Sequence, residues 1–154
     1  MASFVRQDKA GDNLSHAGAR CYWRRVREIP PYARLLKLRF ESGGVVVMPF
    51  HEDVIGRPGF LHGGAIAGLL EFAAYTKLSA QIGDDSVTMK PVTVTVDYMR
   101  PGADRETFAA ARVERLGASV ANVEAVAWQE QRDQPIASAR LNFLLDRPGT
   151  GADS

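Results

Sequence analysis

The stretch "GFLHGGAIAGLLEFAAY", residues 59–75, decides how the rest of the chain folds. From His62 to about Ile82 the spacing of alanines and leucines predicts a helix, and Gly83 is a suitable residue to end it. This helix is apolar on nearly every side, which is typical of a helix buried around most of its circumference. A sheet that curls around it satisfies that requirement.

The segments that flank the helix predict strands. Before it, residues 33–42 ("ARLLKLRFES") and 45–50 ("VVVMPF") are expected to be strands joined by a turn at Gly43 and Gly44. After it, residues 92–99 alternate between two faces, with Val92, Val94, Val96 and Tyr98 on one of them. Three more strands are expected over 107–117, 119–131 and 135–146, with turns at 117–118 and 132–133. The expected fold class is therefore α+β, with a long antiparallel six-stranded sheet wrapped around one central helix.

The ends of the chain differ from this domain. Residues 1–32 are expected to form an N-terminal extension with a short helix over 13–28, which the prolines of "IPPY" (29–32) stop. Residues 33–146 form the domain, and 147–154 are rich in glycine and small polar residues and predict a flexible tail.

Composition excludes several classes of function. The chain has 154 residues, 45% of them apolar, with a net charge of +1, so no overall field attracts nucleic acid or a membrane. A single cysteine, Cys21, allows no internal disulfide, and no signal peptide or membrane span is apparent, so we expect a cytoplasmic protein. The three histidines lack metal-ligand spacing, and no serine-hydrolase elbow or nucleotide-binding loop is present, so no metal or cofactor is expected.

Glu71 is the one acid in the apolar stretch of the helix. An ionised carboxylate in such a setting costs several kcal/mol unless it is compensated. The positions three and four residues away are Ala67, Gly68, Ala74 and Tyr75, so no local salt bridge exists. Glu71 is therefore either satisfied by a distant partner or used in chemistry.

Gly63 and Gly64 stand at the expected start of the helix. Backbone N–H groups in a first turn lack helical partners and can bind an oxyanion or a polarised carbonyl, although the glycines could simply allow a tight junction. Gly63 and Glu71 are eight residues apart, about 12 Å along a helix, which is too far for one glutamate side chain to reach. Two copies packed antiparallel about a two-fold axis would bring Glu71 of one chain near Gly63 of the other.

The sequence "HGG" at 62–64, with Glu71 nine residues after the histidine, resembles the hotdog-fold acyl-CoA thioesterases. "VTVTVDYMRPG" at 92–102 is similar to the strand that follows the helix in that family, and the resemblance covers residues 33–146. It is strongest to the phenylacetate-degradation (PaaI) and 4-hydroxybenzoyl-CoA thioesterase group.

The resemblance implies hydrolysis of an acyl-CoA thioester to a carboxylic acid and free CoA, with CoA present only as part of the substrate. It implies a homodimer, which in this family can pair into a tetramer. Gly63 would polarise the thioester carbonyl, and Glu71 of the other subunit would act as nucleophile or general base. His62 and Gly64 complete the implied catalytic loop, with His62 holding the helix start by hydrogen bonds. The residues expected to contact substrate are Phe60, Leu61, Leu70 and Tyr75 along the acyl group, Thr93 on the later strand, and Arg100 and Arg57 near the CoA phosphates.

The sequence also departs from the family pattern. Gly56 stands where many relatives carry Asn or Gln, which removes a side-chain donor to the carbonyl. Tyr75 stands where one branch has a small hydroxyl residue, and Ala118 follows Gly117 where many relatives have a basic residue. A non-catalytic acyl-thioester or lipid-binding module of the same fold is therefore an alternative. A hydratase of this fold needs an Asp/His pair in the helix region, which this chain lacks.

Overall fold

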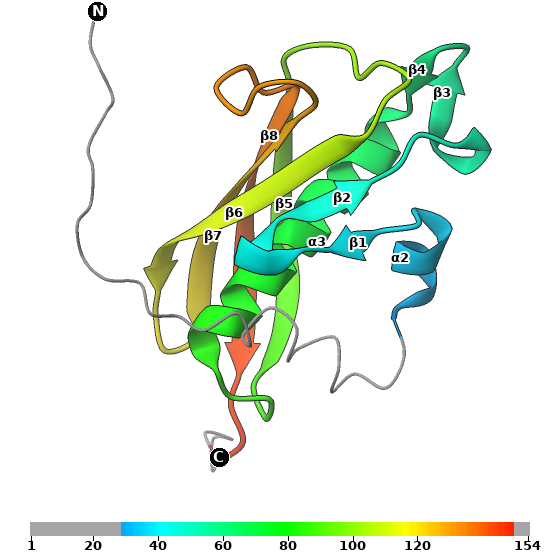
Figure 1. Cartoon of the computed structure of the whole chain (residues 1–154). Coiled ribbons are helices and arrows are strands. Elements are labelled where there is room, and N and C mark those ends of the chain that lie inside the picture. The colour runs from blue at the N-terminus through cyan, green and yellow to red at the C-terminus, as the bar shows by residue number, and fades with distance from the viewer. Residues whose placement is uncertain (1–28, 150–154) are drawn as a thin grey trace, which may run out of the picture.

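One long helix, α3 (Gly63–Ile82), lies at the centre of the molecule (Figure 1). A computed structural model describes residues 29–149 of the chain. The helix is capped by His62 and ends at Gly83, whose φ of 65° is left-handed and whose N–H donates to the Ser79 carbonyl. Both ends are as the sequence predicts. The helix expected over 13–28, Cys21 and the end of the tail lie outside the described residues.

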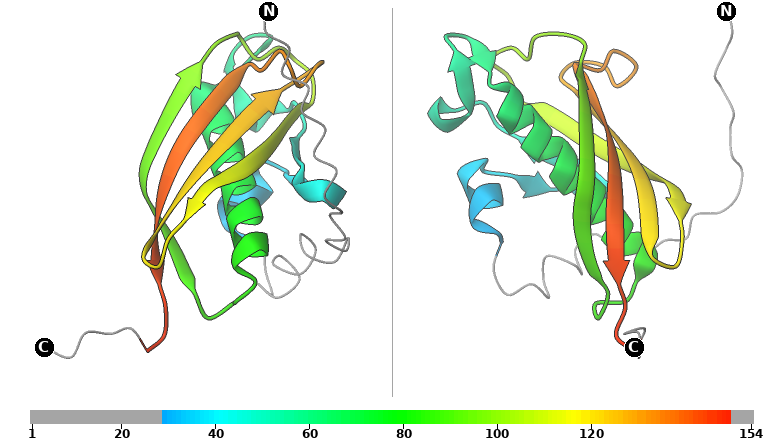
Figure 2. Two further views of the ribbon diagram at one scale, coloured as in Figure 1. Left: turned by 90° about the vertical axis from the view of Figure 1, so that its left-hand side faces the viewer. Right: turned by 180° about the vertical axis from the view of Figure 1, so that it is seen from behind.

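A six-stranded antiparallel sheet packs against this helix and curves around it. Its strands, in spatial order, are β1 (Arg39–Phe40), β2 (Val46–Met48), β6 (Thr107–Leu116), β7 (Val120–Trp128), β8 (Ala137–Asp146) and β5 (Thr88–Tyr98). The sheet curves across the helix, which packs against β2, β5, β6, β7 and β8 (Figure 2). The expected α+β class, the six strands and the central helix are confirmed.

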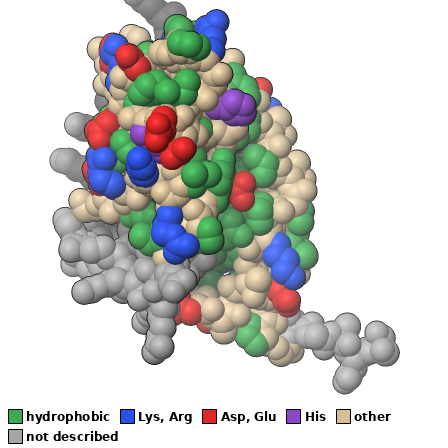
Figure 3. All heavy atoms as spheres, turned by 90° about the vertical axis from the view of Figure 1, so that its right-hand side faces the viewer, with side chains coloured by type: hydrophobic (Ala, Val, Ile, Leu, Met, Phe, Trp, Pro, Cys, Tyr) green, Lys and Arg blue, Asp and Glu red, His purple; other side chains and the backbone are tan. Residues whose placement is uncertain are grey.

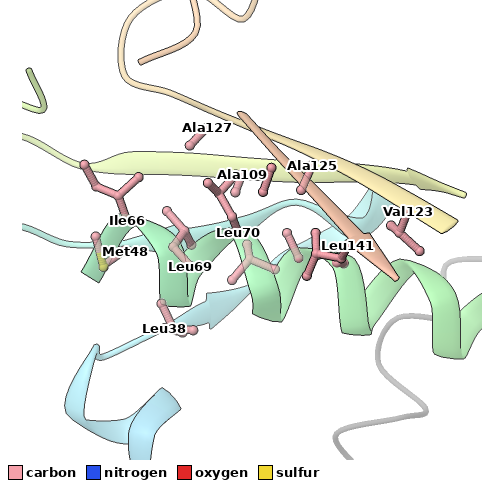
Figure 4. Packing of buried hydrophobic residues seen from close by; sticks show 14 of the residues in the cluster. Leu38, Met48, Ile66, Leu69, Leu70, Ala109, Val123, Ala125, Ala127 and Leu141 are labelled. Carbon is pink, nitrogen blue, oxygen red and sulfur yellow. The ribbon is translucent and has the colours of Figure 1, made fainter. Parts of the chain in front are cut away.

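Small side chains on the inner face of the sheet let the helix come close. Ala125 and Ala127 of β7, and Ala137 and Ala139 of β8, are at most 1% exposed. From the helix, Ile66 and Leu70 point toward the strands that carry Ala109 and Ala127 (Figure 4). The bulky residues of α3 therefore fill the space that the alanines leave, which is the close packing expected of a protein interior.

The segment before the sheet corrects the sequence prediction. Residues 33–42 are not one strand: α2 (Pro31–Leu35) is a short helix, and only Arg39–Phe40 pairs with β2. Proline at the first helical position is favoured because its fixed φ suits a helix and its missing N–H has no helical partner there. Pro31 therefore begins a helix, whereas the sequence argument used it to end one.

The segment between β2 and α3 contains regular structure as well. A single 3₁₀ turn, η2 (Glu52–Val54), leads into a small second sheet formed by β3 (Ile55–Arg57) and β4 (Phe60–Leu61). The turn at Gly43 and Gly44 is confirmed, because both lie in the 3₁₀ turn η1 (Ser42–Gly44) and both have a φ of 80°. The second sheet delivers the chain to the start of α3.

Helix α2 rests on α3 at a glycine. A Cβ at Gly68 would lie 2.7 Å from the Tyr32 ring, closer than real Cβ contacts. The Tyr32 hydroxyl reaches the Gly64 carbonyl at 3.3 Å, and its ring lies 6.4 Å from that of Phe72. The absent side chain at Gly68 thus sets how closely α2 approaches the helix.

Leu69→Ala should lower the free energy of unfolding by about 2–5 kcal/mol, since Leu69 is fully buried and its removal leaves a cavity. Chemical denaturation monitored by circular dichroism measures the change. Leu144→Ala is the matched control, because Leu144 is 41% exposed on the outer face of β8 and should cost far less. Equal losses for the two leucines would contradict this account of the core.

Candidate active site

The start of α3 is capped by its own histidine. The Gly64 N–H donates to His62 Nδ1 at 2.9 Å, and the His62 backbone N–H donates to the Val54 carbonyl at 2.8 Å. Because Nδ1 is the acceptor, the proton of the neutral ring is on Nε2. His62 therefore holds the loop and the helix start, as the resemblance implies, and Gly64 has its donor occupied.

The peptide that links His62 and Gly63 leaves one donor free. Its carbonyl accepts from the N–H groups of Ala65 and Ile66, at 3.0 and 3.3 Å. In a trans peptide the N–H points away from the carbonyl, so the Gly63 N–H projects outward beyond the helix start. Within residues 29–149 this N–H has no acceptor, and of the two glycine amides it is the one left for a carbonyl oxygen.

Tyr98, at the end of β5, contacts the same turn. Its hydroxyl donates to the Gly63 carbonyl at 2.8 Å, and its ring would lie 3.3 Å from a Cβ at position 63. The sequence argument did not include Tyr98 among the site residues. The signal was its place in the alternating stretch, on the same face as Val94 and Val96, but only the strand pairing shows that this face meets the helix.

Glu71 lies two turns further along the helix. Gly63 faces Tyr98 of β5 and Gly68 faces Tyr32 of α2, and a rotation of about 100° per residue puts Glu71 between these directions. Burial raises the pKa of the Glu71 carboxyl above its ordinary value of 4.5. No hydrogen bond or ion pair to Glu71 comes from the part of the chain that the structure describes. The carboxylate is half-buried there without compensation.

The residues expected along the acyl group are spread over several environments. Phe60 is half-buried beneath the Arg57 guanidinium, which lies 4.2 Å from the ring centroid. Leu61 and Leu70 belong to the core, at 8% and 0% exposure. Tyr75 packs edge-on against Phe143 and donates its hydroxyl to the Met89 carbonyl at 2.6 Å. Of these side chains, Phe60 and Tyr75 are partly exposed and the two leucines are buried.

Two further expected residues, Thr93 and Arg100, lie on β5 and just after it. Thr93 pairs with Asn142 and is exposed on the outer face of the sheet, opposite to the face that covers α3. The Arg100 guanidinium donates to the Pro135 carbonyl at 2.7 Å. The structure thus groups His62, Gly63 and Gly64 at one point, places Glu71 along the same helix, and leaves Thr93 on the other side of the sheet.

Gly56 has a steric reason to lack a side chain. A Cβ there would lie 2.9 Å from the His62 Cα, because β3 bulges between Ile55 and Arg57 where it passes the helix start. The backbone atoms in this contact cannot move aside cheaply. An Asn or Gln at this position is therefore incompatible with the observed path of β3.

The face that carries the β3–β4 hairpin has mixed charge. Hydrophobic, basic and acidic side chains are interspersed on it, with no field of one sign (Figure 3). Among residues 29–149 no three His, Cys, Asp or Glu side chains cluster as metal ligands would. No helix in the same range is long and apolar enough to cross a membrane.

The sequence matches the family model of the acyl-CoA thioesterase N-terminal domain over residues 53–144, more than half of the chain. The chain belongs to the acyl-CoA thioesterase family. It is accordingly a thioester hydrolase, and the matched region begins just before the β3–β4 hairpin and includes α3. No curated protein sequence matches this thioesterase significantly.

Solved structures share the fold of this thioesterase. A Bacillus halodurans protein crystallised with CoA superposes with a TM-score of 0.71 at 20% identity, covering 92% of this chain and 93% of that one. The PaaI protein of the Escherichia coli phenylacetic acid degradation operon gives 0.70 at 21% identity, over 84% and 94%. A Pseudomonas aeruginosa protein gives 0.69 at 27% identity, over 79% and 98%. The thioesterase therefore has the hotdog fold.

Glu71→Gln should make the isolated chain, measured at high dilution, more stable than the wild type at about pH 7, because residues 29–149 offer the half-buried charge no compensation. The wild type loses stability as the pH rises from 4.5 through the raised pKa of Glu71, since the folded state holds that proton more tightly than the unfolded chain. The stability gain of Glu71→Gln should vanish at about pH 3.5, where the wild-type carboxyl is protonated in both the folded and the unfolded state. Denaturation at several pH values measures it, with exposed Glu52→Gln as the control for losing one charge. A gain that does not depend on pH would contradict this explanation.

Proposed function

We propose that this thioesterase hydrolyses acyl-CoA at a site shared by two chains, with Glu71 of one chain acting on a thioester carbonyl bound at Gly63 of the other. The observation that carries the proposal is the separation of the two groups. The Gly63 N–H and the Glu71 carboxylate, for which the described residues supply no partner, are both on α3, eight residues or about 12 Å apart. A single chain therefore cannot bring its own acid to its own amide.

The edge of the sheet supports pairing of two chains. Strand β5 has β8 on one side and no neighbour beyond it among the described residues. Its side chains include Val92, Val94 and Tyr98 at 61%, 41% and 53% exposure. A long apolar edge strand of this kind is a template for pairing with another strand. Pairing of two β5 strands about a two-fold axis would run the two α3 helices antiparallel and bring each Glu71 toward the partner's helix start.

The proposed reaction uses both the Gly63 N–H and the Glu71 carboxylate. The Gly63 N–H, at the positive end of the helix dipole, polarises the carbonyl and then stabilises the oxyanion that forms on it. As general base, Glu71 takes a proton from water while the water oxygen bonds to the carbonyl carbon. The carbon–sulfur bond then breaks and the proton passes to the departing CoA sulfur. Direct attack by the carboxylate, followed by hydrolysis of the anhydride, is the nucleophilic form of the same chemistry.

The raised pKa of Glu71 suits the role of base. A carboxylate with a higher pKa removes a proton from water more readily, and a partner's helix start would help to keep it charged. Gly56 adds no side-chain donor, so the Gly63 N–H carries the polarisation in this proposal. Binding of acyl-CoA without release of thiol would support the non-catalytic alternative instead.

Gly63→Pro should lower kcat by about 10²–10³, because proline has no N–H to polarise the thioester carbonyl. The position tolerates proline: Gly63 is the first helical residue, and His62 has φ and ψ of −70° and 135°, which suit a residue before proline. Gly63→Ala adds the same Cβ beside Tyr98 but keeps the N–H, so it should retain most of the activity. Release of free thiol from aryl, short-chain and long-chain acyl-CoA substrates is the assay. Equal activity of the Pro and Ala variants would remove Gly63 from the mechanism.

Mixing two inactive variants tests the shared site. Glu71→Gln alone should lose about 10²–10⁴ in kcat, as expected for removal of a general base. Co-refolded with Gly63→Pro, it should regain about a quarter of the wild-type activity, since half of the dimers are mixed and each mixed dimer has one complete site. Each variant refolded alone is the control. If no activity returns although mixed dimers form, each site belongs to a single chain.

A further inference from the structure

The peptide that links Gly63 and Gly64 is held at both ends. Its carbonyl accepts from the Tyr98 hydroxyl at 2.8 Å, and its N–H donates to His62 Nδ1 at 2.9 Å. The carbonyl also belongs to the first turn of α3, and a carbonyl oxygen has two lone pairs, so the Tyr98 contact adds to the helical bond. Two side chains from different parts of the fold therefore fix the plane of a single peptide.

This peptide adjoins the one that carries the free donor. The Gly63 N–H lies on the preceding plane, and the two planes meet at the Gly63 Cα. Glycine imposes little restriction on the two torsions at that atom, so two consecutive glycines make the helix start adaptable. Holding the second plane removes much of this freedom and with it the variation in the direction of the Gly63 N–H.

We propose that Tyr98 is a positioning residue for thioester hydrolysis, its hydroxyl fixing the Gly63–Gly64 peptide so that the Gly63 N–H points at the bound carbonyl. The inference rests on the proposed function and adds to it a residue from the edge strand β5. The phenol has one proton, which it donates to the Gly63 carbonyl, so Tyr98 acts through the helix start and makes no donor contact to the substrate. Small displacements of an oxyanion donor are costly, which makes such support useful.

The contact also links the site to the proposed dimer edge. Tyr98 is 53% exposed and stands on the strand that we propose to pair with its counterpart in a second chain. Any movement of this strand would be transmitted to the Gly63–Gly64 peptide through one hydrogen bond. The direction of the Gly63 N–H is therefore coupled to the position of β5.

Tyr98→Phe tests the role because it keeps the ring that packs on Gly63 and removes only the hydroxyl. We expect kcat to fall about tenfold while KM changes by less than about twofold, since the loss concerns transition-state stabilisation. The backbone amide resonances of Gly63 and Gly64 should shift in nitrogen–proton correlation spectra. Thr95→Val is the matched control, because it removes a hydroxyl from the outer face of the same strand and should change neither readout.

A double variant separates positioning from a general structural effect. In the Gly63→Pro background the donor is absent, so adding Tyr98→Phe should cost little further activity. An undiminished tenfold loss in that background, or a wild-type kcat for Tyr98→Phe in an active protein, overturns the positioning role while leaving the proposed function intact. A wild-type protein that releases no thiol from any acyl-CoA overturns the proposed function and the positioning role together.

Discussion

Burial of an apolar helix by a curved sheet is the constraint on which the rest of the structure depends. Leu69, Leu70 and Leu78 of α3 are completely buried, and each contributes roughly 1.5–3 kcal/mol of hydrophobic stabilisation. A flat sheet covers only one side of such a helix. The strands therefore curve around it, and alanines on their inner faces allow the close approach.

This arrangement leaves one strip of the helix outside the sheet, and the candidate chemistry lies on that strip. The strip runs between the edge strand β5 and the small helix α2, and it includes Gly63 and Glu71. Neither group has a polar partner within residues 29–149: one is a donor without an acceptor and the other an acid without a base. The half-buried carboxylate costs free energy in an isolated chain. A thioester and a second chain are proposed to satisfy both at once.

Hydrogen bonds at the start of α3 fix the direction of the Gly63 N–H. His62 takes part in four hydrogen bonds, one through its backbone N–H, two through its carbonyl and one through its ring. Tyr98, which follows Gly63 by 35 residues, adds a fifth hydrogen bond at this turn. The β3 bulge brings Gly56 so close to His62 that no side chain fits between them. In the proposed site the Gly63 amide takes the place of the Asn or Gln side chain that many relatives, according to the resemblance, carry.

The sequence by itself determined the central helix with both of its ends and the four strands after it, because periodicity and a glycine at the helix end are local signals. It also determined the family, because the "HGG" motif and Glu71 can be recognised at their spacing in the sequence. It also singled out Glu71, since an acid in an apolar helix is costly whatever surrounds it. Only the tertiary structure decided that Pro31 begins a helix, that Gly64 is occupied by His62 and that Tyr98 reaches Gly63. The Tyr98 contact joins residues 35 positions apart, and the helix that begins at Pro31 packs through Tyr32 on Gly68 of α3, so local preferences do not encode these partners. The Gly64–His62 hydrogen bond is short in sequence, but it requires the backbone conformation of the helix start, which the residue pattern alone does not specify.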